Sequence, residues 1–331
     1  MSALHIDDLR VHYHGGEQPL QAVGGCSLSL EPGQTVGLVG ESGCGKSTLG
    51  MAIMGLLPPS ATVQARQATL HGKPLFDARG TVPRHLRGRH IAMVFQDPMT
   101  SLNPYLSIEQ HFRYPLREHM RLGRAAARER ACSLLTQVGI PDPARRLRRY
   151  PHEFSGGQRQ RIGIALALSC DPSVLIADEP TTALDVTIQA QILRLLGELQ
   201  RQRGLALLLI THDLGVVAQS CQRTMVMYAG YCVEDAPTRQ LLSQPGHPYT
   251  RALLGAVPGG ARDPGSRLTN IPGLPPRLSQ PAPSCPFAPR CPQVEARCQQ
   301  QNPALLEIAD QHQAACLLHH PPVTAHTVAA P

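Results

Sequence analysis

A short glycine-rich segment near the start of the chain could bind phosphate. Gly40-Glu-Ser-Gly-Cys-Gly-Lys-Ser47 matches the pattern G-x-x-x-x-G-K-[ST]. Its glycines let successive backbone N–H groups turn towards one anion, Lys46 can reach the β- and γ-phosphates, and Ser47 can offer its hydroxyl to Mg²⁺. The segment lies between an apolar strand predicted over residues 34–39 and a helix predicted from Lys46 to about Leu57. This context favours a nucleotide site over a chance glycine-rich turn.

Two acids follow an apolar run later in the chain. Val174–Ala177 predicts a buried strand, and Asp178 and Glu179 come directly after it. Asp178 can hold Mg²⁺ through a water, whereas Glu179 points elsewhere and can polarise a water against the γ-phosphate. An acidic turn without chemistry is the alternative, and the upstream phosphate loop favours the catalytic interpretation.

A second anion site is predicted before a helix that covers Arg159–Leu168. Ser155, Gly156 and Gly157 precede this helix, so free N–H groups and the positive end of the helix dipole coincide there. Two phosphate-binding segments in one chain are unusual for a kinase or a small GTPase. They make sense if each nucleotide site is built from two chains.

Strand-length apolar runs alternate with helical patterns, which predicts an α/β core with a parallel sheet. The runs are residues 34–39, His90–Phe95, Val174–Ala177, Leu205–Thr211 and Thr224–Tyr228. A long amphipathic helix is predicted over Val186–Arg203 and is closed by Gly204. A charged, helix-compatible stretch covers Leu106–Ala131.

The composition is that of a globular protein. The chain has 331 residues, 42% of them hydrophobic and 17% charged, with a net charge of +7, which excludes disorder of the whole chain. Apolar stretches such as Ile162–Cys170 fall well short of the roughly 18–20 residues that span a bilayer. The first ten residues are not typical of a secretory signal. We therefore expect a chain that stays in the cytosol, where thiols are reduced.

In order and spacing, these motifs resemble the nucleotide-binding subunits of ABC transporters, most of all the dipeptide and oligopeptide importer branch. The resemblance covers about residues 3–318. Phe154–Gln158 is similar to the signature motif, Val174–Glu179 to the Walker B strand and Thr182–Asp185 to the D-loop. Phe154 and Thr182 replace the usual Leu and Ser, and neither change removes a catalytic group.

The resemblance implies a set of functional residues. The catalytic residues are Glu179, His212 as the switch histidine and Gln96 as the Q-loop glutamine, and Mg²⁺ binds through Ser47, Gln96 and Asp178. Tyr13 stacks on adenine, although a sheet-surface tyrosine is the alternative. The remaining ATP-binding residues are Gly40, Glu41, Ser42, Gly43, Cys44, Gly45, Lys46, Ser47 and Thr48 of the Walker A loop, with Ser155, Gly156, Gly157, Gln158 and Asp185.

The fold that the resemblance implies is an α/β P-loop NTPase domain of ABC type over residues 1–255. It contains an N-terminal antiparallel β subdomain and an inserted helical subdomain at about residues 105–170. A C-terminal extension with a Cys-rich site covers residues 256–331, and His247-Pro248-Tyr249 matches the motif that opens it. Residues 258–286 are rich in proline and predict a linker or an extended arm, and the last dozen residues, from His319, predict disorder.

The expected function is ATP hydrolysis coupled to uptake of dipeptides or oligopeptides, at the cytoplasmic face of the inner membrane. The expected partners are a second, non-identical ATPase subunit, two transmembrane permease subunits and a substrate-binding protein. Nickel or another small solute is an alternative cargo, and a soluble ABC ATPase or a small-molecule kinase is an alternative function. A basic stretch, with Arg121, Arg124, Arg128, Arg130, Arg145, Arg146, Arg148 and Arg149, lacks recognition motifs, and we expect no nucleic acid.

Four of the ten cysteines crowd near the end of the chain, with the spacing Cys285-x5-Cys291-x6-Cys298-x17-Cys316. Four thiolates on a proline-rich arm in a reducing compartment suggest a metal centre. Zinc ribbons prefer a C-x2-C spacing, and these wider gaps suit an iron–sulfur cluster as well. Some members of the peptide importer family hold a 4Fe–4S cluster in this extension. We expect that cluster, with Zn²⁺ or a set of small buried cysteines as the alternatives.

Overall fold

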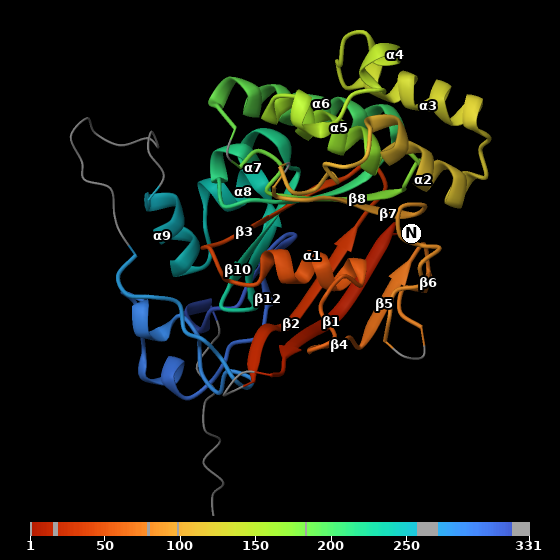
Figure 1. Ribbon diagram of the computed structural model, residues 1–331. Helices are drawn as coiled ribbons and strands as arrows, with labels where there is room; N and C mark the ends of the chain where they lie inside the picture. Colours follow the sequence, from red (N-terminus) through yellow and green to blue (C-terminus); the bar gives the residue numbers. More distant parts are fainter. Residues whose placement is uncertain are drawn as a thin grey trace, which may run out of the picture.

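The computed structural model describes residues 2–15, 19–77, 80–97, 99–182, 184–256 and 271–319. A mixed eight-stranded sheet runs through this part of the chain, in the order β12-β13-β11-β10-β3-β9-β8-β7 (Figure 1). The strands from β10 to β7 pair in parallel, which confirms the predicted α/β core. The eight strands are β3 (Thr35–Val39), β7 (Ile91–Val94), β8 (Val174–Asp178), β9 (Ala206–Ile210), β10 (Arg223–Tyr228), β11 (Tyr231–Pro237), β12 (Leu306–Ala309) and β13 (His312–Ala314).

A smaller antiparallel sheet holds the N-terminal strands β1 (Leu4–Tyr13), β2 (Leu20–Leu30), β4 (Ala61–Gln64), β5 (Gln67–Leu70) and β6 (Lys73–Pro74). Helix α1 (Lys46–Met54) contacts strands of both sheets, and its buried Leu49 and Ile53 belong to a core that the two sheets share. The helix ends before the predicted Leu57 because Gly55 adopts a left-handed backbone with φ of 63° and its N–H bonds to the carbonyl of Ala52.

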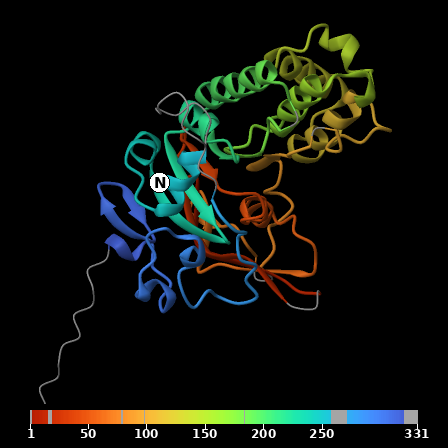
Figure 2. The same cartoon turned by 90° about the vertical axis from the view of Figure 1, so that its left-hand side faces the viewer.

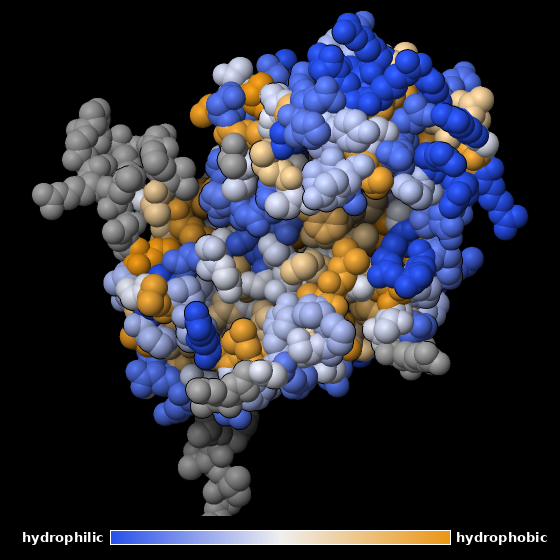
Figure 3. Space-filling model, viewed as in Figure 1, coloured by the Kyte–Doolittle hydropathy of each residue, from blue (hydrophilic) through white to orange (hydrophobic). Residues whose placement is uncertain are grey.

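A helical lobe covers the β7 end of the core sheet (Figures 1 and 2). It contains α2 (Ile108–Met120), α3 (Arg124–Gln137), α4 (Pro143–Arg146) and α5 (Gly156–Ala167). The next helix, α6 (Val186–Arg203), has the predicted bounds. The stretch Leu106–Ala131 is broken after Met120, where Arg121 takes a left-handed φ of 54° and Gly123 starts the next helix. Figure 3 shows mostly hydrophilic side chains on the visible face of this lobe.

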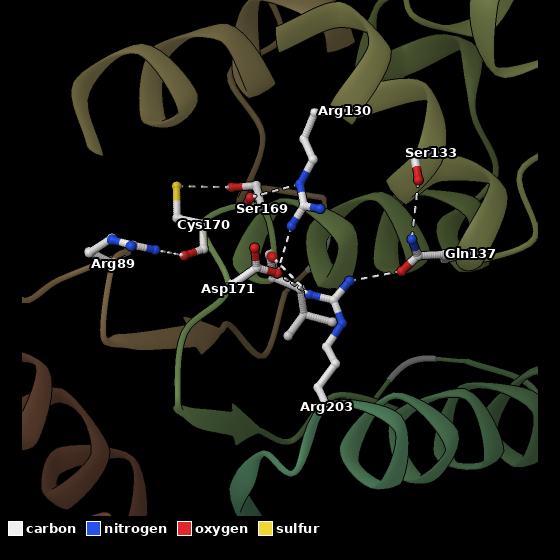
Figure 4. A network of polar contacts seen from close by, with 9 residues as sticks. Arg89, Arg130, Ser133, Gln137, Ser169, Cys170, Asp171 and Arg203 are labelled. Atoms are coloured by element: carbon white, nitrogen blue, oxygen red, sulfur yellow. Dashed lines mark hydrogen bonds and ion pairs between the residues drawn. The ribbon is translucent and has the colours of Figure 1, made fainter. Parts of the chain in front are cut away.

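Ion pairs fix the lobe to the core sheet (Figure 4). Asp171, just before β8, accepts from Arg130 of α3 at 2.6 Å and from Arg203 at the end of α6 at 2.9 Å. Other arginines of the basic stretch also have partners within the chain: Arg124 pairs with Glu109, and Arg149 pairs with Glu153. These side chains therefore have structural contacts of their own.

The C-terminal residues pack against the rest of the chain. Three short helices follow β9, namely α7 (Leu214–Ser220), α8 (Thr238–Ser243) and α9 (Pro248–Ala256). Strand β13 then pairs with β11 and so extends the core sheet. Residues 271–286 form no helix or strand, yet the carbonyl of Leu278 accepts from the Gln21 N–H of β2 at 2.7 Å. The predictions for residues 258–270 and from residue 320 onward lie outside the described residues.

Among the helices that the structure describes, none has the length and apolar character needed to cross a bilayer.

Candidate nucleotide site

The phosphate loop connects β3 to α1, and steric constraints fix its glycines. Gly45 has a φ of 104°, and a Cβ there would lie 2.3 Å from the carbonyl oxygen of Ala22. A Cβ on Gly40 would lie 2.1 Å from the carbonyl oxygen of Met227. Larger residues would push this loop away from the sheet, so the glycines allow the close backbone packing that the loop requires.

Lys46 and Ser47 begin α1 at the edge of the loop. Lys46 is buried, and its Nζ donates to the carbonyls of Gly40 at 2.8 Å and Glu41 at 3.0 Å. Ser47 Oγ donates to Asp178 Oδ1 at 3.0 Å, which brings two of the predicted Mg²⁺ ligands together. Burial raises the pKa of Asp178 above its ordinary value, and a bound cation would offset that cost. Gln96, the third predicted ligand, contacts Glu179 instead.

Glu179 is oriented by three side chains. Its Oε2 accepts from Gln96 Nε2 at 2.9 Å and from Thr182 Oγ1 at 2.8 Å, and its Oε1 lies 3.2 Å from His212 Nδ1. Burial would raise the pKa of Glu179, but the hydrogen bonds from Thr182 and His212 outweigh it and leave the pKa lowered. The residue also has a left-handed φ of 43°, a strained conformation of the kind that clusters at functional sites.

A pocket over the loop brings distant segments together. The predicted residues that line it are Tyr13, Ser42, Gly43, Gly45, Lys46, Ser47, Thr48, Gln96 and Glu179. Sequence reasoning missed the other lining residues, which are Leu20, Gln21, Ala22, Ala229, Gly230, Pro276, Arg277 and Leu278. Three of these come from the C-terminal extension, and no local pattern in the sequence indicates that they reach the nucleotide pocket.

The signature residues lie elsewhere. Ser155 caps α5 by accepting from the Gln158 N–H at 3.4 Å, while Gln158 Oε1 accepts from the Ser155 N–H at 3.2 Å, and Gly156 and Gly157 form the first turn. Asp185 caps α6 by accepting from the Ile188 N–H at 2.9 Å. None of these residues lines the pocket around Lys46. Within one chain they are therefore separate from the phosphate loop.

The four C-terminal cysteines line one small pocket together with Phe287, Ala288 and Leu317. The Cys285 N–H donates to the carbonyl of Cys298 at 3.0 Å, which closes the segment between them. Burial raises the pKa of Cys285 and Cys291, and it raises that of Cys316 to about 11. Over the described residues, no group of three or more His, Cys, Asp or Glu side chains is arranged to hold a metal ion. The cluster therefore stays a prediction.

Comparison with known proteins gives consistent matches. The family model described as ABC transporter matches residues 23–182, and the one for the oligopeptide/dipeptide transporter C-terminal region matches residues 233–298. A probable peptide ABC transporter ATP-binding protein of Sinorhizobium fredii is 49% identical, over 95% of this chain and 94% of its own. The dipeptide transport ATP-binding protein DppD of Escherichia coli is 46% identical, over 97% of both chains.

Solved structures show the same fold. The protein cbiO1 of Clostridium perfringens, part of an ABC transporter complex, aligns with a TM-score of 0.60 at 28% identity, over 73% of this chain and 91% of its own. The ATP-binding cassette MJ0796, solved as a dimer bound to ADP and Pi, aligns with a TM-score of 0.62 at 27% identity. The alignment covers 71% of this chain and 99% of MJ0796.

Proposed function

The chain belongs to the ABC transporter family, and we propose that it is the ATP-hydrolysing subunit of an importer for dipeptides or oligopeptides. The observation that carries the proposal is the convergence of the phosphate loop, Asp178 and an oriented Glu179 at one end of the core sheet. The peptide cargo is supported by the names of relatives that match over nearly the whole chain. It is also supported by the match of the C-terminal region to peptide transporters.

The geometry supports a hydrolytic sequence. On ATP binding, Lys46 exchanges its two backbone carbonyl partners for phosphate oxygens. Ser47 and Asp178 would hold Mg²⁺, which neutralises charge on the phosphates. Glu179, with its pKa lowered, is a carboxylate near neutral pH and can accept a proton from the attacking water. Gln96 and His212 contact the Glu179 carboxylate and fix its orientation.

Two chains are needed to complete each site in this proposal. Ser155 and the N–H groups at the start of α5 form an anion site that the chain's own ATP does not occupy. A second subunit, most simply a non-identical homologue, would present the same segment across the dimer. MJ0796 provides a precedent, because it was solved as a dimer at this fold similarity.

A groove beside Gln96 fits a permease contact at the cytoplasmic face of the inner membrane. The groove is lined by apolar residues that include Met93, Phe95 and Leu102, and 45% of Phe95 is exposed. An exposed apolar groove next to a residue that holds Glu179 could couple docking to hydrolysis. A substrate-binding protein would act through the permeases.

The cysteine pocket is proposed to hold a 4Fe–4S cluster. Four cysteines around one pocket supply the donor set that such clusters use. Bound metal would order a segment that has few large apolar residues to bury. Zn²⁺ is the alternative occupant.

Uptake measurements test the proposed function. In a strain that lacks this chain, the wild-type chain should restore uptake of a labelled dipeptide, and Lys46→Ala should not. Uptake of labelled nickel by the same cells tests the alternative cargo. Restored nickel uptake without dipeptide uptake would show that the cargo is nickel and would leave the proposed ATPase role unchanged.

A further inference from the structure

The C-terminal extension contacts the phosphate loop through one buried ion pair. Arg290 Nη1 donates to Glu41 Oε2 at 2.7 Å, and Arg290 Nη2 donates to Glu41 Oε1 at 2.9 Å. The two residues are 249 positions apart in the sequence. The Arg290 side chain is only 5% exposed, so water screens this bidentate pair weakly.

Arg290 is fixed by its other contacts. Its Nε donates to the carbonyl of Pro272 at 2.8 Å, and its guanidinium lies over the ring of Tyr228, 5.7 Å from the centroid. It ends a short helical turn directly before Cys291, which lines the cysteine pocket. The position of the guanidinium therefore depends on the fold of the extension.

Glu41 is an anion inside an anion-binding loop. Its carbonyl accepts from Lys46 Nζ at 3.0 Å, and its N–H donates to the hydroxyl of Tyr249 at 2.9 Å. A free carboxylate at this position would repel the phosphates of ATP, because the repulsion between like charges is only weakly screened in a partly buried site. Arg290 balances that charge and holds the carboxylate against the extension, and Glu41 is not among the residues that line the pocket.

We propose that Arg290 is a positioning residue for ATP binding, which neutralises Glu41 and so makes the affinity of the phosphate loop depend on the C-terminal extension. The inference rests on the proposed ATPase function. It differs from a simple packing role, because the effect of losing Arg290 should disappear when Glu41 carries no charge.

The test is a titration of the full-length chain with a fluorescent ATP analogue. Arg290→Met should weaken binding by about 10-fold, and the double variant Glu41→Gln with Arg290→Met should return to within about 3-fold of wild type. Glu41→Gln alone should bind at least as tightly as wild type. The matched control is Arg297→Met, which breaks the exposed pair with Glu295 in the same extension and should leave affinity unchanged.

Two results would overturn the inference. One is unchanged affinity in Arg290→Met, and the other is a double variant as weak as Arg290→Met, which would leave a packing role only. If Arg290→Met does not fold, the double variant still decides, because it removes the carboxylate together with its partner, and binding more than about 3-fold weaker than wild type would leave a packing role only. Wild-type protein that binds no ATP would instead refute the proposed function itself.

Discussion

Gln96 donates a hydrogen bond of 2.9 Å to Glu179 Oε2, although the two residues follow different strands, β7 and β8, of the core sheet. The same oxygen accepts from Thr182, and His212 meets the other oxygen. Parallel pairing of β7 with β8 places the ends of both strands at one edge, which is why residues so far apart in sequence meet there. The carboxylate is therefore oriented by side chains of the same chain.

Thr182→Val removes one of these donors while keeping the shape of the side chain. The variant should hydrolyse ATP about 10- to 100-fold more slowly, because Glu179 loses one of the hydrogen bonds that orient it. ATP affinity should change little, since Thr182 does not line the pocket. Thr187→Val on the exposed side of α6 is the control, and equal rates for the two variants would contradict the role of Thr182.

Ser155→Arg should abolish steady-state hydrolysis while the isolated chain still binds ATP. The large cation blocks the anion site at the start of α5, which is proposed to serve the nucleotide of the partner subunit. Ser133→Arg, an exposed change in the same lobe, should keep normal turnover. An equal loss of ATP affinity in monomeric Ser155→Arg would show that the site is not shared between chains.

Acid should destabilise the folded chain through His247. This side chain is 1% exposed, and burial lowers its pKa from 6.5 to about 3. Between pH 6.5 and about 3, His247 binds a proton in the unfolded chain but not in the folded chain. The free energy of unfolding therefore falls as the pH drops through this range. The slope from this residue reaches roughly 1.4 kcal/mol per pH unit.

Urea unfolding at a series of pH values checks this slope. His247→Asn should be less stable than wild type at neutral pH but should lose less stability on acidification. The exposed His85→Asn should follow the wild-type curve. A wild-type slope in His247→Asn would show that other groups cause the acid sensitivity.

Anaerobically purified protein should be brown, with the broad visible absorption of an iron–sulfur centre. Cys298→Ser should bleach this colour and expose the extension to protease, because each of the four cysteines that line the pocket is proposed to supply one ligand to the cluster. Cys132→Ser, in the helical lobe, is the control and should keep the colour. Colourless protein with stoichiometric zinc would refute the cluster and keep the site, whereas metal-free protein with a protected extension would refute both.

The sequence predicted what depends on neighbours along the chain. The buried strands and the span of α6, with its closing Gly204, follow from local periodicity and capping, and the structure confirms them. The break within Leu106–Ala131 was missed, because the charged pattern continues across Gly123.

Contacts between remote segments were not predictable in this way. The pair Arg290–Glu41 and the bond from Gln21 to Leu278 join a proline-rich extension to the first strands and the phosphate loop. No hydrophobic period in residues 271–290 indicates what surface they cover, since they form no regular helix or strand over most of their length. Their partners are determined by tertiary packing alone.

ATP turnover and complex size, measured together for Glu179→Gln and Lys46→Ala, test the central claim most directly. In the proposed mechanism, Lys46 holds phosphate before and after hydrolysis, whereas Glu179 acts only on the attacking water. Glu179→Gln should bind ATP with near wild-type affinity, accumulate a closed dimer and hydrolyse ATP at least about 100-fold more slowly than wild type. Lys46→Ala should bind ATP weakly. Wild-type turnover by Glu179→Gln in the assembled transporter would contradict the account.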